Sequence, residues 1–81
     1  MTVYPNPTTG ILNIQIANLG TPISKFLLYD IYGKLVDKVW LQNSDSTETA
    51  QIDLAELSNG IYFVKAVADG KVVAVRKVVK Q

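Results

Sequence analysis

Apolar and polar residues alternate with a period of two along most of this chain. In the stretch ILNIQIAN, Leu12, Ile14 and Ile16 fall on one side, while Asn13 and Gln15 fall on the other. This alternation is typical of a β-strand with one buried face. The first long apolar run is therefore predicted to be a half-buried strand.

Six further segments have the same strand-like character. They are a short extended entry at Thr2–Tyr4 and the stretches at 23–30, 35–42, 50–54, 60–68 and 71–79. Turn clusters separate them at intervals of about 8 to 12 residues, which is typical of an antiparallel sandwich. Asp69-Gly70, between two β-rich runs, is the strongest hairpin signal. The sequence thus predicts an all-β, immunoglobulin-like antiparallel β-sandwich of about seven strands, with a small barrel as the alternative.

The alternation also identifies the expected core. We expect it to contain Leu12, Ile14, Ile16, Phe26, Leu28, Ile52, Leu54, Leu57, Tyr62 and Val64. Tyr62 follows the bend DLAELSNG, where an immunoglobulin-like sandwich places its corner tyrosine. Its ring is therefore predicted to be buried, with its hydroxyl bonded to the backbone a few residues upstream.

Length and composition indicate one domain. The chain has 81 residues, 48% of them hydrophobic, and no cysteine, so the core must stabilise the fold without disulfides. No apolar run approaches the ~18 residues that a membrane-spanning helix needs. The amino terminus, MTVYPNP, lacks the basic and apolar regions of a secretory signal. A cytosolic protein and a piece of a longer secreted chain would look alike here.

Charge and residue types argue against several functions. The formal net charge of +1 argues against nucleic-acid binding, and the absence of histidine removes the commonest general base and metal ligand. The seven acidic residues are spread singly along the chain. We therefore expect no enzymatic activity, no cofactor and no metal site.

Two segments have both a functional and a structural interpretation. NSDSTE, at 43–48, offers oxygen ligands for calcium, but it lacks the ligand count and central glycine of a calcium loop. A solvated hairpin loop is the preferred interpretation. Trp40 with Tyr29 and Tyr32 could form an aromatic platform for a sugar. We favour the alternative that Trp40 covers one end of the core.

The two ends of the chain are unusual in composition. YPNPTTG, at Tyr4–Gly10, should be an extended entry followed by a turn, because proline disfavours helix at the residue before it. From Lys71 to Gln81 there are four basic side chains and no acid. This last run is either a docking strip or an edge strand whose charges prevent aggregation.

Three pieces of sequence occur in a fixed order. They are YPNPTTG at the start, YDIYGKLV in the middle, and NGIYFVK followed by RKVVK at the end. Together they resemble the C-terminal sorting domain of cargo proteins of the bacterial type IX secretion system, in the larger of its two main classes. The resemblance covers essentially the whole chain.

The resemblance implies a non-catalytic secretion signal, here a single domain at 1–81 taken from a longer secreted protein. Such domains follow a covalently linked cargo that enters the periplasm of a Gram-negative bacterium. The machinery comprises an outer-membrane translocon, a shuttle protein and a sortase-like peptidase. The cargo then reaches the cell surface or the medium, and the domain is cleaved or used for anchoring. We expect a monomer without a membrane span.

The resemblance also implies roles for individual residues. The candidate recognition residues are Pro5, Asn6, Pro7, Thr9 and Gly10 in the entry motif, and Arg76, Lys77 and Lys80 in the terminal strand. The candidate structural residues are Asp30, Gly33, Gly60, Tyr62, Asp69 and Gly70. A second hypothesis stays open, in which the chain is an immunoglobulin-like interaction or carbohydrate-binding module of an extracellular enzyme.

Overall fold

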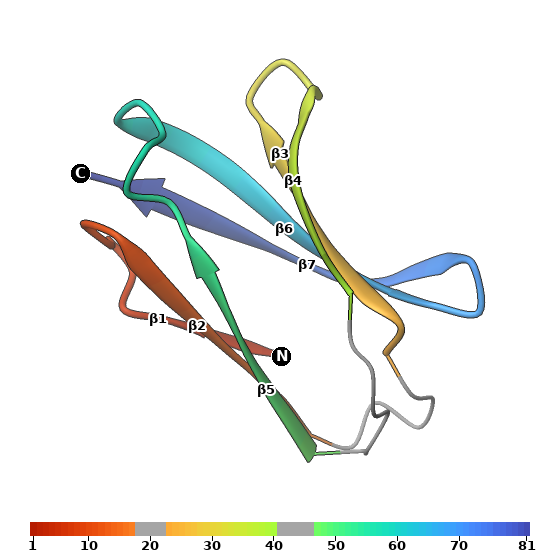
Figure 1. The fold of residues 1–81 in the computed structure, drawn as a ribbon. Coiled ribbons are helices and arrows are strands. Elements are labelled where there is room, and N and C mark those ends of the chain that lie inside the picture. The colour runs from red at the N-terminus through yellow and green to blue at the C-terminus, as the bar shows by residue number, and fades with distance from the viewer. Residues whose placement is uncertain (18–22, 41–46) are drawn as a thin grey trace.

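Two antiparallel sheets pack face to face in the computed structural model, which describes residues 1–17, 23–40 and 47–81 (Figure 1). The three-stranded sheet has the order β1 (Thr2–Tyr4), β2 (Ile11–Ala17), β5 (Thr47–Asp53). The four-stranded sheet has the order β4 (Leu35–Trp40), β3 (Lys25–Asp30), β6 (Gly60–Ala68), β7 (Lys71–Lys80). The predicted seven-stranded, immunoglobulin-like sandwich is confirmed, and the barrel alternative is wrong.

The core lies between the two sheets and matches the alternation of the sequence. Nine of the ten predicted core side chains are no more than 7% exposed, and the tenth, Leu57, is half-buried and packs against them. Ile23, Ala66, Ala68 and Val78 are also buried in the core. Full burial stabilises a side chain such as Phe or Ile by roughly 1.5 to 3 kcal/mol, so this cluster supplies the main stabilisation of a domain without disulfides.

The β6–β7 hairpin turns at the predicted dipeptide. Asp69 and Gly70 have φ values of 52° and 74°, so both occupy the left-handed region. Two consecutive residues in this region form the turn whose twist matches that of the flanking strands. The hairpin prediction is confirmed, and β6 and β7 pair from this turn to Gly60 and Lys80.

The β3–β4 turn is organised by one carboxylate. Oδ1 of Asp30 accepts hydrogen bonds from the backbone N–H groups of Tyr32 and Lys34, each at 2.9 Å. Gly33 has a φ of 80°, which glycine adopts without steric cost. The expected structural roles of Asp30 and Gly33 agree with this geometry.

In the described part of the chain, no helix is long and apolar enough to cross a membrane.

Candidate functional site at the motif end of the sandwich

The structure brings the sequence motifs together at one end of the sandwich. We call this the motif end, and it consists of Tyr4–Gly10, Asp30–Gly33, Leu57–Tyr62 and Lys77–Gln81. In Figure 1 the carboxyl terminus lies beside the start of β6, and the loop that leads from the entry into β2 lies on the same side of the molecule. Hydrogen bonds join the entry motif, the terminal strand and the corner before β6, and Asp30 pairs with Tyr62 across β3 and β6.

The entry motif pairs with the terminal strand. Nδ2 of Asn6 donates to the carbonyl oxygen of Lys77, and Oδ1 of Asn6 accepts from the N–H of Val79, both at 2.9 Å. The N–H of Thr8 donates to the carbonyl oxygen of Val79, and the N–H of Gln81 donates to that of Thr8, both at 2.8 Å. Asn6 and Thr8 thus line the free edge of β7 as a short additional strand would.

This pairing explains how the last residues of an edge strand are protected. An edge strand exposes unpaired N–H and C=O groups that attract other chains. Here the edge from Lys77 to Gln81 is occupied by Asn6 and Thr8 of the same molecule. The entry motif and the terminal strand, which the sequence presented as two separate candidates, therefore form one structural unit.

Thr8 is the buried centre of the entry motif. It is 1% exposed, and its hydroxyl donates to the carbonyl oxygen of Ile11 at 3.0 Å and accepts from the N–H of Gly10 at 3.2 Å. The carbonyl oxygen of Gly10 in turn accepts from the N–H of Leu54 at 3.0 Å. Sequence reasoning missed Thr8, because nothing in the pattern TTG shows which of its two threonines turns inward.

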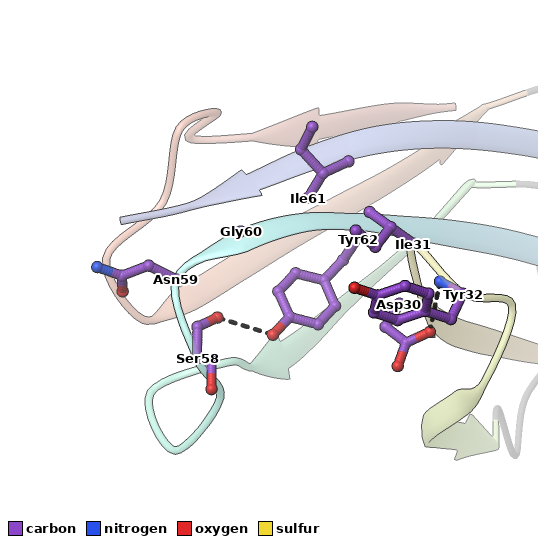
Figure 2. Close-up of a pocket in the computed structure, with 8 residues that line it drawn as sticks. All are labelled: Asp30, Ile31, Tyr32, Ser58, Asn59, Gly60, Ile61 and Tyr62. Atoms are coloured by element: carbon purple, nitrogen blue, oxygen red, sulfur yellow. Dashed lines mark hydrogen bonds between the residues drawn. The ribbon is translucent and has the colours of Figure 1, made fainter.

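The corner before β6 completes the motif end. Figure 2 shows a hollow lined by Asp30–Tyr32 on one side and Ser58–Tyr62 on the other. Nζ of Lys80 donates to Oδ1 of Asn59 at 3.3 Å, which joins the terminal strand to this corner. Gly60 is the first residue of β6 and pairs with Lys80.

The candidate recognition residues differ in their exposure. Most of them are exposed: Pro5, Asn6, Pro7, Thr9, Arg76 and Lys77. Gly10 is half-buried, and Lys80 is only 7% exposed, so its ammonium group faces the corner and not the solvent. Arg76 holds the amino terminus, since its Nε donates to the carbonyl oxygen of Met1 at 3.0 Å. The terminal strand therefore exposes Arg76 and Lys77, but not Lys80, to solvent.

The aromatic platform does not assemble. Trp40 lies opposite Lys25 at one end of the β3–β4 pair, whereas Tyr29 lies opposite Leu35 near the other end, next to the turn that holds Tyr32. The preferred alternative is also wrong, because Trp40 is 61% exposed and does not cover the core. Of the possible calcium loop at 43–48, residues 43–46 lie outside the part of the chain that the structure describes.

Tyr62 is the corner tyrosine that the sequence predicts. It is 7% exposed, and its hydroxyl donates to the carbonyl oxygen of Ser58 at 2.7 Å (Figure 2). The substitution Tyr62→Phe keeps the ring and leaves that carbonyl without its donor, so we expect a loss of about 1 to 3 kcal/mol of stability. The denaturant midpoint measures this loss, and a midpoint equal to that of the wild type would contradict a stabilising role for the bond.

The motif end presents several polar residues to solvent. Its exposed prolines, Asn6 and Thr9 lie on the same sandwich as the exposed Lys77, and Arg76 is the next residue along β7. Among the described residues, no three acidic, histidine or cysteine side chains gather as metal ligands would. Fold and site thus define a small β-sandwich module of the kind that presents a surface to a partner.

Comparison with known proteins identifies the family of this module. The family model described as the secretion system C-terminal sorting domain matches residues 2–81. The chain therefore belongs to the C-terminal sorting domains of type IX secretion, whose cargo reaches the cell surface or the exterior of a Gram-negative cell. No curated protein sequence matches the chain.

Proposed function

We propose that this domain is a non-catalytic sorting signal that directs a covalently linked N-terminal cargo across the outer membrane. The cargo passes through the periplasm, and the domain is then cleaved or used for surface anchoring. The observation that carries the proposal is the family match over residues 2–81. The assembly of the family's motifs into one end of the fold supports it, because that end is a single surface that the secretion machinery can read.

Within this function, we assign recognition to the exposed part of the motif end. The exposed residues of the entry motif lie along the end of β7, because Asn6 bonds to Lys77 and Val79 and the Thr8 backbone bonds to Val79 and Gln81. A partner that contacts one segment therefore meets the other as well. The proposed partners are the outer-membrane translocon, the shuttle protein and the sortase-like peptidase of the type IX system.

The test is the location of a reporter protein. A reporter with an N-terminal signal peptide is fused ahead of residues 1–81 and expressed in a type IX-competent Gram-negative cell. We expect the reporter at the surface or in the medium, and in the periplasm of an otherwise identical strain without the translocon. A reporter that stays in the periplasm of both strains would contradict the sorting function and favour the interaction-module hypothesis.

A further inference from the structure

The outer face of the four-stranded sheet combines apolar side chains with lysines. Register places Lys25, Lys38, Lys65 and Lys77 on this face, because the residues next to them along the strands, such as Phe26, Val64 and Val78, point into the core. Acidic residues are absent from the outward positions of the described strands in this sheet, since Asp37 lies opposite buried Leu28. In a chain of net charge +1, this is a marked separation of charge.

Several large apolar side chains of this face are exposed. Leu35, Trp40, Ile61 and Val75 point outward and are 40 to 61% exposed. A hollow on the same face is lined in part by Tyr29, Phe63, Lys65 and Val75. Asp30 borders this hollow at the β3–β4 turn, where its carboxylate already accepts two backbone hydrogen bonds. Exposed apolar patches bordered by polar groups are typical of interaction sites.

The lysines lie over the aromatic rings of the face. Nζ of Lys25 and Nζ of Lys38 lie 4.7 Å and 5.5 Å from the centre of the Trp40 ring, and Nζ of Lys65 lies 4.5 Å from that of Tyr29. These cation–π contacts hold the ammonium groups within the apolar surface. Positive charge therefore lies among the apolar side chains of the inner strands β3 and β6 as well as on the edge strand β4.

The outer face of the other sheet provides a contrast within the same molecule. Its outward positions on β1, β2 and β5 are mostly polar, and the described strands place no lysine or arginine there. They also include the exposed apolar side chains of Tyr4 and Ile11 and the acidic Asp53. The two faces therefore differ chiefly in positive charge. On the described strands, only the four-stranded sheet combines exposed apolar side chains with lysines.

We propose that the outer face of the four-stranded sheet docks onto an acidic protein surface of the secretion machinery, with carboxylates that surround an apolar patch. This inference rests on the proposed sorting function and adds a second contact area to it. The face adjoins the motif end, because Ile61 and Lys77 belong to both and Phe63 pairs with Lys77. Complementary charge would steer the encounter, and apolar contact would stabilise the complex.

A protein fits this face better than a lipid surface. A protein that lies on a membrane places its apolar side chains in the centre and its lysines at the rim, where the ammonium groups reach the headgroups. Here Lys38 and Lys77 lie on the edge strands, but Lys65 lies on an inner strand, between Leu27 on β3 and Val75 on β7. A carboxylate at a fixed position on a protein can pair with a lysine such as Lys65, away from the rim.

Export of the fused reporter tests the inference. The variant Lys38→Glu with Lys65→Glu places two carboxylates on the proposed docking face, and the control Gln15→Glu with Gln51→Glu places two on the opposite face. Melting curves of the purified domains confirm that both are folded. We expect the docking-face variant to lower the exported fraction at least about tenfold, because like charges oppose association, and the control to match the wild type.

A second variant and a lipid assay complete the test. If the double Glu variant does not fold, Lys38→Gln with Lys65→Gln replaces it, and a smaller but clear decrease in export is expected. Vesicles of phosphatidylglycerol or phosphatidylcholine are floated with the wild-type domain, and we expect the domain not to float with either.

Each contrary result has its own meaning. Normal export of a folded docking-face variant, or an equal loss in the control, would overturn the docking role while the sorting function stands. If the wild-type domain floats with phosphatidylglycerol vesicles and the Lys38 and Lys65 changes abolish flotation, the face binds lipid and the proposed protein partner is wrong. Failure of the wild-type domain to export its reporter would remove the sorting function itself.

Discussion

Ile14→Ala is expected to destabilise this domain strongly and so to impair its use as a signal. Ile14 is fully buried on β2, the central strand of the three-stranded sheet, where it pairs with Val3 and Ala50. Removing its branched side chain leaves a cavity that costs about 2 to 5 kcal/mol. The free energy of unfolding of a domain of this size is only about 5 to 15 kcal/mol. The melting temperature should therefore fall by roughly 10 to 30 °C.

Gln15→Ala is the matched control for this prediction. Gln15 is the next residue on the same strand, and it is exposed. Its substitution should change stability by no more than about 0.5 kcal/mol and leave reporter export unchanged. If the domain with Ile14→Ala is unfolded at the growth temperature but still exports its reporter like the control, the machinery reads a linear segment and does not require the folded sandwich.

Local periodicity accounts for the correct part of the prediction. Strand alternation and the Asp69-Gly70 turn are properties of neighbouring residues, so they can be read from the sequence directly. They predicted seven strands and nine buried core positions, and the corner position predicted the Tyr62–Ser58 bond. Val78 was missed because the run KVVAVRKVV contains apolar residues at both alternating positions, so its buried side is ambiguous.

The part that sequence could not predict depends on long-range pairing. Asn6 and Lys77 are 71 residues apart, and no local pattern shows that the amide of Asn6 bonds to the backbone of β7. Lys80 illustrates the same limit, because a lysine in a basic run is expected in solvent, yet its partner is Asn59. Trp40 was misplaced for the opposite reason: burial is usual for tryptophan, but here two lysines cover the ring.

Deletion of Lys77–Gln81 is expected to unfold the domain and not merely to remove a docking strip. These residues pair with the first part of β6, from Gly60 to Phe63, and they include Val78, which is fully buried. They also form the hydrogen bonds that join Asn6 and the backbone of Thr8 to the end of the chain. Burial of Val78 contributes roughly 2 kcal/mol and each lost hydrogen bond about 1 kcal/mol, which together approach the whole stability of a small domain.

Lys77→Glu separates the two roles of this segment. The Lys77 side chain is exposed and only its backbone carbonyl bonds to Asn6, so charge reversal should cost no more than about 1 kcal/mol. We expect the truncated domain to show no cooperative melting transition and the Lys77→Glu domain to melt near the wild type. A truncated domain with a wild-type melting curve would contradict the structural role of the entry pairing. If the truncated domain is folded, its loss of export reports lost docking alone. If it is unfolded, only the folded Lys77→Glu variant tests whether the machinery reads the basic strand.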